Sequence, residues 1–244
     1  MTQFTLVAVL LFAFISPCVA MGEGKEATSQ ILTSFPELTS LKLEEVGITI
    51  YYNPKSSEVL SDKPSQPTES NEEEPPVFHP LRSQLLGEKK GSFLIACDNG
   101  ASDDPGCAIL KEEGGNQKEV SKKIWGLIFI FPGDGSIYAE GHMNTMFNER
   151  KKYAWKNNAF SEVKQPYKYV GLDSTTKTAV TLVSSPSDKE VVATLPKGSP
   201  VTVLLNEGDH YLIKTPFGVL GWLTIQEGSM EENSPIKGIY YAGD

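Results

Sequence analysis

The stretch Thr178–Thr224, TAVTLVSSPSDKEVVATLPKGSPVTVLLNEGDHYLIKTPFGVLGWLT, decides the fold of the last quarter of the chain. Its apolar runs have the length of β-strands and recur about every ten residues. Pro, Gly, Asp and Ser, which favour turns, separate the runs. The expected strands are Ala179–Val183, Val191–Leu195, Val201–Leu205, His210–Lys214 and Val219–Leu223. Five short strands with tight turns predict a small closed barrel.

Three motifs in this stretch carry a resemblance to a known family. Leu195–Gly198 resembles the turn after the second strand of the bacterial SH3 domain, Val201–Leu204 the following strand, and Gly221–Leu223 the closing Gly-Trp-Leu. The resemblance covers about a fifth of the chain. Thr181–Pro186 departs from the family pattern, because the Arg and the Gly of the opening strand are missing. The resemblance implies a non-catalytic barrel that is appended to exported proteins and binds peptides or cell-wall material.

The aromatic residues of this barrel are candidates for ligand binding. SH3-like barrels bind peptides in a shallow groove lined by aromatic side chains. The candidates are Tyr211, Phe217 and Trp222, with Asp209 and His210 at the rim. Strand alternation places Tyr211 on one face and Leu212 on the other. We expect Trp222 in the core and Phe217 exposed at a turn, so that Phe217 and Tyr211 form the contact patch.

The start of the chain predicts export. Residues 4–15 form an apolar core of about twelve residues, and small residues precede a cleavage position after Ala20. This pattern predicts a signal peptide over residues 1–20 and a periplasmic or secreted protein. Cys18 suggests a lipid anchor as the alternative, but Pro17 occupies a place where a lipobox requires a small residue. No later segment is apolar enough for a membrane helix.

Cysteine usage agrees with export. Cys97 and Cys107 remain after removal of the signal peptide, and an even pair in an oxidising compartment predicts a disulfide. The loop between them is rich in carboxylate and other oxygen groups, which makes calcium binding an alternative to ordinary turn chemistry. Its spacing does not match an EF-hand, so the turn interpretation is favoured and neither a metal nor a cofactor is expected.

The remaining sequence divides by composition. Residues 21–52 carry one expected strand, Val46–Tyr52, and residues 53–77 are rich in Pro, Ser and Glu, which predicts a disordered linker. Residues 78–172 predict an antiparallel β domain, with a central strand over Lys122–Phe131. The barrel follows over residues 173–227, and residues 228–244 form a tail. The predicted class is therefore mostly β: an antiparallel β domain followed by a small SH3-like β-barrel.

Charge and motifs limit the function classes. The formal net charge of −9 argues against nucleic acid and anionic membranes as partners. No motif for metal, phosphate or nucleophilic chemistry occurs. The remaining catalytic candidates are His142, Glu140 and Asp134, because a His beside carboxylates can act as a general base.

Two functions of different classes therefore compete. The first is a non-catalytic exported binding or adaptor protein whose partner is a peptide, peptidoglycan or an envelope protein. The second is an envelope hydrolase with chemistry around His142 and the barrel as its targeting module. The absence of a catalytic motif favours the first. The sequence leaves the ligand and the oligomeric state open.

Overall fold

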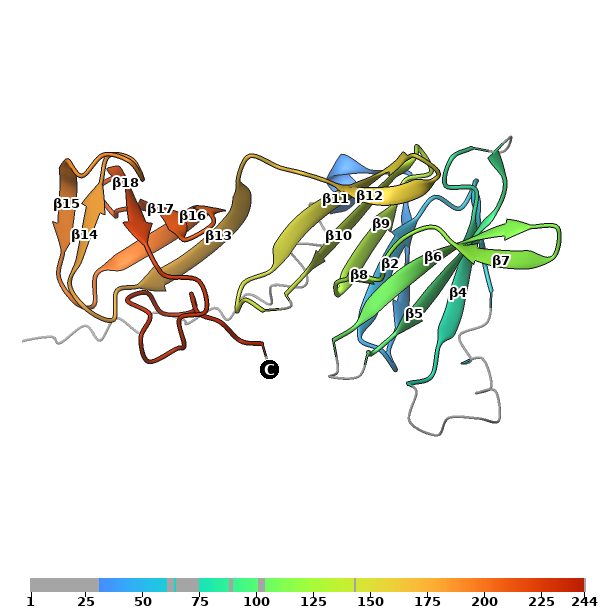
Figure 1. The fold of residues 1–244 in the computed structure, drawn as a ribbon, viewed down its shortest axis with the longest axis horizontal. Coiled ribbons are helices and arrows are strands. Elements are labelled where there is room, and N and C mark those ends of the chain that lie inside the picture. The colour runs from blue at the N-terminus through green and yellow to red at the C-terminus, as the bar shows by residue number, and fades with distance from the viewer. Residues whose placement is uncertain are drawn as a thin grey trace, which may run out of the picture. The chain divides into compact units, whose positions relative to one another are not determined.

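A computed structural model describes residues 31–60, 64, 75–87, 90–100, 104–142 and 144–243. The mostly β class is confirmed, since eighteen strands and a single helical turn over residues 31–34 make up the regular structure of these ranges. No described helix has the length and apolarity that crossing a membrane requires. Residues 37–244 form one compact unit, and its strands lie in three sheets (Figure 1). The predicted signal peptide lies outside the described residues.

The first sheet has the order β1-β2-β9-β10-β11-β12. Its strands are β1 Thr39–Leu43, β2 Ile48–Tyr52, β9 Ile128–Phe131, β10 Ser136–Gly141, β11 Glu149–Lys156 and β12 Ala159–Val163. The expectation of one strand before residue 53 is wrong, because β1 and β2 form a hairpin. β2 and β9 are parallel, whereas the other neighbours are antiparallel. The hairpin of β11 and β12 turns at Asn157 and Asn158, and both residues adopt positive φ.

The second sheet has the order β3-β4-β5-β6-β7, with β8 also paired to β6. Its strands are β3 Ser57–Val59, β4 Phe78–Ser83, β5 Phe93–Asp98, β6 Gly106–Glu113, β7 Asn116–Glu119 and β8 Ile124–Trp125. Part of the predicted linker is therefore ordered, because β3 pairs with β4. Most of residues 61–74 lie outside the described residues. Cys97 and Cys107 face each other in β5 and β6 and form the predicted disulfide.

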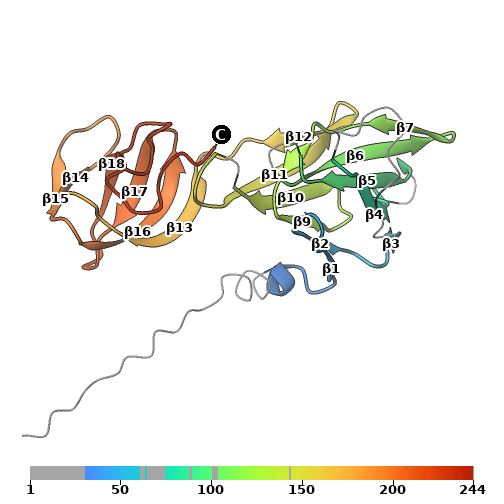
Figure 2. The ribbon, with the colours of Figure 1, turned by 90° about the horizontal axis from the view of Figure 1, so that it is seen from below.

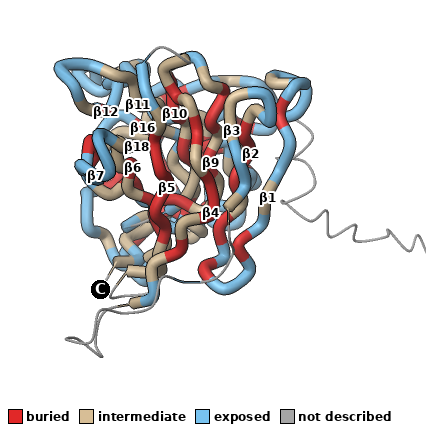
Figure 3. The backbone as a smooth tube through the Cα atoms, turned by 90° about the vertical axis from the view of Figure 1, so that its right-hand side faces the viewer, coloured by how far each residue is buried: buried red, intermediate tan, exposed pale blue. Residues whose placement is uncertain are grey.

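The first two sheets share one apolar core. Strand alternation directs Ile48 and Ile50 of the first sheet, and Phe93 and Ile95 of the second, into this core, where each is at most 1% exposed. Phe93 contacts Trp155 of β11 edge-on, with ring centroids 5.6 Å apart. Many residues of β5, β9 and β10 are buried (Figure 3). The residues before β4 thus belong to the same domain as those after it.

A glycine contact interrupts the predicted central strand. β8 pairs with β6 in the second sheet and β9 with β10 in the first, so the chain changes sheet between Trp125 and Ile128. The Leu127 N–H donates to the Glu140 carbonyl at 2.8 Å. A Cβ on Gly141 would lie 2.6 Å from the Gly126 Cα, so this approach requires glycine. The prediction of one continuous strand over Lys122–Phe131 is therefore wrong.

The third sheet has the order β13-β16-β17-β18-β14-β15 (Figure 2). Its strands are β13 Lys168–Thr175, β14 Val180–Val183, β15 Val191–Leu195, β16 Pro200–Glu207, β17 His210–Lys214 and β18 Leu220–Thr224. The five predicted strands are all present. β13 adds a sixth strand beside β16, so the boundary at residue 172 cuts through a strand and is wrong. Among the described strands the two edge strands, β13 and β15, do not pair, so the sheet is open and the predicted small closed barrel is not confirmed.

A second apolar core covers one face of this sheet. It contains Leu182, Val203 and Ile213, each fully buried. Ile236 and Ile239 of the predicted tail are also buried in this core, so that segment is part of the fold. The tail is held further by bridges from Thr176 to Ile236 and from Thr145 to Tyr241. Because Ile236 and Ile239 are buried, residues 228–244 do not form the separate tail that the sequence predicts.

Candidate functional site

The register of the third sheet separates the predicted ligand-binding residues. Tyr211 lies opposite Leu223, whereas Leu212 lies opposite Trp222. Ile213 is fully buried, so Tyr211 shares the core face and Trp222 lies on the other face. Tyr211 packs against the core and meets the Phe147 ring edge-on, with centroids 6.3 Å apart. The expectation of a core Trp222 is therefore wrong.

Phe217 does not meet Tyr211 in one patch. Phe217 lies in the turn between β17 and β18 and is 67% exposed, as predicted for a turn tip. Tyr211 lies near the opposite end of β17, and its ring is directed to the core face. The predicted contact patch of Phe217 and Tyr211 is thus not formed, since the strand length and the pleat place the two side chains apart.

The two rim residues have structural partners. The Asp209 carboxylate accepts a hydrogen bond from the Glu227 N–H at 2.8 Å, and the Asp209 carbonyl accepts one from Ile225. His210 Nδ1 lies 3.1 Å from the Thr224 hydroxyl. Asp209 therefore fixes the chain that leaves β18, and its carboxylate is a positioning group for Glu227.

An apolar ladder crosses the outer face of the third sheet. Its six members are directly opposite one another on successive strands: Tyr169, Leu205, Leu212, Trp222, Val183 and Val191. The two ends are the most exposed, with Tyr169 at 53% and Val191 at 57%. The Tyr167 ring covers part of Trp222, with centroids 6.3 Å apart. Trp222 thus contributes to an outer apolar surface.

The three catalytic candidates are not brought together. The Asp134 carboxylate accepts a hydrogen bond from the Ser136 N–H at 2.9 Å, in the turn before β10. His142 lies beyond the other end of β10, with Nδ1 3.4 Å from the Asn148 side-chain oxygen. Glu140 forms a bidentate ion pair with Arg150, at 3.0 and 3.1 Å. The length of β10 separates Asp134 from His142, so these groups cannot act on one reacting atom.

The oxygen-rich disulfide loop also has internal partners. The Asp98 carboxylate accepts a hydrogen bond from the Gly100 N–H at 2.6 Å and forms an ion pair with Lys123. Within the described residues, no group of three or more His, Cys, Asp or Glu side chains could hold a metal ion. Residues 101–103 lie outside the described ranges. The Asp98 contacts fit the turn interpretation of this loop.

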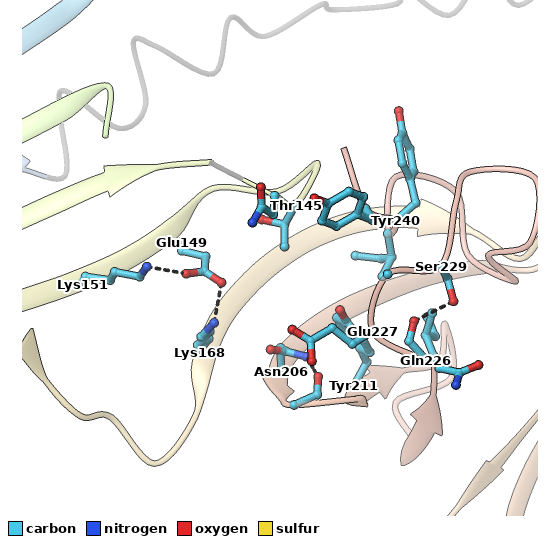
Figure 4. A pocket seen from close by; sticks show the side chains of 16 residues that line it. Thr145, Glu149, Lys151, Lys168, Asn206, Tyr211, Gln226, Glu227, Ser229 and Tyr240 are labelled. Carbon is cyan, nitrogen blue, oxygen red and sulfur yellow. Dashed lines mark hydrogen bonds and ion pairs between the residues drawn. The ribbon is translucent and has the colours of Figure 1, made fainter. Parts of the chain in front are cut away.

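A cavity of about 510 Å³ lies beside the core face of the third sheet (Figure 4). Tyr211 lines it from β17, and Lys168 lines it from β13. Such a volume is within the range of small-ligand sites. The other lining residues come from the connection between β10 and β11 and from β11 (Asn144, Thr145, Glu149, Lys151), from β16 and its turn (Asn206, Gly208), and from the C-terminal segment (Ile225, Gln226, Glu227, Gly228, Ser229, Ile239, Tyr240, Tyr241).

Glu149 and two lysines form one wall of the cavity. The Glu149 carboxylate lies 3.0 Å from Lys151 Nζ and 2.5 Å from Lys168 Nζ (Figure 4). Burial alone would raise the pKa of Glu149, but hydrogen bonds from Lys168 and Lys151 outweigh burial and hold that pKa below its ordinary value. Burial opposes the charge on Lys151, yet Glu149 raises the pKa of that lysine. Two ammonium groups thus share one carboxylate, which leaves this wall cationic.

The phenol of Tyr211 contributes a protonated hydroxyl. Burial, together with the negative charges of Asp209, Glu149 and Glu227, raises the pKa of Tyr211 to about 12. The hydroxyl is therefore neutral near pH 7 and can donate a hydrogen bond to a ligand. Glu227 lines the same cavity and carries the opposite charge to the lysine wall.

Backbone contacts of the C-terminal segment hold the remaining wall in place. The Tyr241 N–H donates to the Ser229 carbonyl at 2.8 Å, and the Ser229 hydroxyl donates to the Gln226 carbonyl at 2.6 Å. Asn206 donates from its side chain to the Gly208 carbonyl at 2.6 Å. The cavity is thus lined by positioned hydrogen-bonding groups together with charges of both signs, which is an arrangement suited to binding a polar ligand.

Sequence reasoning found Tyr211 and missed the other members of this cavity. The run Ile236–Tyr241 contains two isoleucines and two tyrosines, and this signal in the supposed tail could have indicated packing. Lys168 and Glu149 carry no such signal, because their pairing depends on a contact between two strands of different sheets. Comparisons with family models, with curated proteins and with solved structures find no match to this chain.

Proposed function

We propose that this chain is an exported, non-catalytic binding protein whose C-terminal sheet is a bacterial SH3-like module. Support for the module comes from the motifs at Leu195–Gly198 and Gly221–Leu223, and from the order of β14 to β18 along the chain. β13 and the segment around Ile236 are additions to that module.

Export is supported by two independent features. The apolar segment over residues 4–15 with small residues before position 21 has the pattern of a cleaved signal peptide. The disulfide between Cys97 and Cys107 fits an oxidising compartment, since such bonds persist outside the reducing cytosol. The proposed location is the periplasm or the exterior of the cell.

The proposed ligand is a peptide segment, such as the peptide part of a cell-wall strand or a loop of an envelope protein. The observation that carries this proposal is the cavity beside Tyr211, which holds ammonium groups at Lys151 and Lys168 and a carboxylate at Glu227. A peptide offers groups that match all of these: amides, carboxylates and amines. The Tyr211 ring adds an apolar surface for a side chain.

Selection from a displayed library of random decapeptides, followed by calorimetric titration of the selected peptides, tests this function. Tyr211→Phe removes the hydroxyl and keeps the packed ring, so it should weaken binding about twofold to tenfold, the value of one hydrogen bond. Tyr167→Phe is the matched control, because Tyr167 is exposed and lies outside the cavity. Failure to select any peptide, or equal affinity of all three proteins, would contradict the proposal.

A further inference from the structure

The cavity beside Tyr211 carries its opposite charges on separate walls. Two of its charged lining residues are acidic, Glu149 and Glu227, and two are basic, Lys151 and Lys168, so the formal charges of the lining sum to zero. Both lysines contact Glu149, whereas Glu227 lies beside Tyr211 and apart from the lysines (Figure 4). The cavity is therefore neutral as a whole, but it has a cationic end and an anionic end.

Lys168 is the available ammonium group of the cationic end. The Glu149 side chain is only 15% exposed, whereas that of Lys168 is 46% exposed, so the ammonium group is the more accessible member of this ion pair. Lys151 takes part of the Glu149 charge and also lies near the negative charge of Glu162, which is outside the cavity. Because Lys168 has only a share in one carboxylate, a ligand carboxylate would give it a second partner.

Glu227 is the available carboxylate of the anionic end. It is exposed and forms no salt bridge within the part of the chain that the structure describes. Its backbone is fixed, because the Glu227 N–H donates to the Asp209 carboxylate at 2.8 Å. Asp209 adds a second negative charge at this end, since the charges of both carboxylates raise the pKa of Tyr211. An ammonium group bound here would meet two negative charges without displacing an internal cation.

The size of the cavity limits the distance between two charges of one ligand. A sphere of about 510 Å³ is about 10 Å across, and three extended residues span about 10 to 11 Å. A peptide of two or three residues therefore fits this space with its terminal ammonium and carboxylate groups at opposite ends. An internal segment of a long chain has neither terminal charge, so it leaves both ends of the cavity unmatched unless its side chains are charged.

We propose that the cavity binds a short peptide with two free ends, with its carboxylate at Lys168 and its ammonium group at Glu227. This inference rests on the proposed function and narrows the ligand from a peptide segment to a free dipeptide or tripeptide. Such a ligand is neutral overall, as the lining of the cavity is. The Tyr211 hydroxyl lines the same space and can donate a hydrogen bond to a backbone carbonyl of the peptide.

NMR titration with trialanine, which carries both terminal charges and only methyl side chains, tests this inference. The wild type should bind trialanine, and N-acetylation or C-amidation of the peptide should each lower affinity about threefold to tenfold. Glu227→Gln should lower affinity for free trialanine by a similar factor and should no longer distinguish the acetylated peptide from the free one. Lys168→Gln should likewise no longer distinguish the amidated peptide. Each variant combined with a blocked peptide forms a double-mutant cycle, which removes any general effect of the variant on the cavity.

Glu44→Gln and Lys197→Gln are the matched controls, because both residues are exposed outside the cavity and the net charge changes equally. Both controls should retain the full loss of affinity for the blocked peptides. The inference is overturned if trialanine does not bind, if blocking either end leaves the affinity unchanged, or if Glu227→Gln and Lys168→Gln discriminate as the controls do. Binding of selected decapeptides without binding of trialanine would overturn this inference alone, whereas failure of both kinds of peptide would overturn the proposed function as well.

Discussion

Replacing Glu149 with glutamine tests the charged wall of the peptide cavity. The Glu149 side chain is 15% exposed, whereas its partners Lys151 and Lys168 are 28% and 46% exposed. This environment lies between an exposed ion pair, worth about 0.2 to 1 kcal/mol, and a buried one, whose disruption costs about 3 to 5 kcal/mol. Glu149→Gln should therefore lower the free energy of unfolding by about 1 to 2 kcal/mol near neutral pH.

The pH dependence of this loss follows from the lowered pKa of Glu149. A carboxyl group with a lowered folded-state pKa stabilises the fold above its ordinary pKa of 4.5, and this stabilisation is lost as the pH falls through the lowered value. Urea denaturation from about pH 7 to about pH 3 should show the difference between wild type and Glu149→Gln shrinking with acidification.

Glu44→Gln is the control for this experiment, because Glu44 is exposed and forms no salt bridge among the described residues. Its effect should stay within about 0.5 kcal/mol at every pH. A loss in Glu149→Gln that does not change with pH would refute the ion-pair explanation. No loss near neutral pH would refute it as well.

Three further predictions concern the fold and are measured by urea denaturation. Ile213→Ala should lower the free energy of unfolding by about 2 to 5 kcal/mol, because Ile213 is fully buried. Trp222→Ala should lower it by less, since Trp222 lies on the outer face of the sheet. A larger loss in Trp222→Ala than in Ile213→Ala would contradict the register. Cys97→Ser should cost about 2 to 3 kcal/mol, and the non-reduced wild type should show no titratable thiol at Cys97 or Cys107. Gly141→Ala should cost about 1 to 3 kcal/mol through the clash with the facing backbone, and wild-type stability in this variant would disprove that contact.

Local patterns were sufficient for the hairpins. The turn Asn157-Asn158 and the alternation on either side of it are encoded within β11 and β12. The five strands from Val180 to Thr224 are likewise separated by turn residues that act locally. For these elements the local sequence is sufficient to predict both the strands and the turns between them.

Pairing between distant segments was not predictable in the same way. The parallel contact of β2 with β9 joins Ile50 to Phe129, and nothing in either strand specifies the other. β13 has a mixed pattern of exposure, because it lies at a sheet edge, and its pairing with β16 was therefore missed. Assigning Trp222 to the core failed for another reason: its size suggested burial, but the alternation from Ile213 places it outside.

The candidate site illustrates the same limit. Tyr211 was found from its residue type, but the cavity also needs Lys168, Glu149 and Glu227, which come from separate parts of the chain. Their proximity depends on packing of the C-terminal segment against the third sheet, through Ile236 and its neighbours. Residue type can therefore nominate a contact residue, whereas the composition of a cavity requires the folded structure.

The most direct test of the proposed peptide site is an NMR titration of the isotope-labelled chain with a selected peptide. The account predicts that the largest amide shift changes occur around the cavity, at Gly208, Tyr211 and Glu227. Largest changes on the outer face instead, at Val191 and Trp222, would contradict the assignment of the peptide to this cavity.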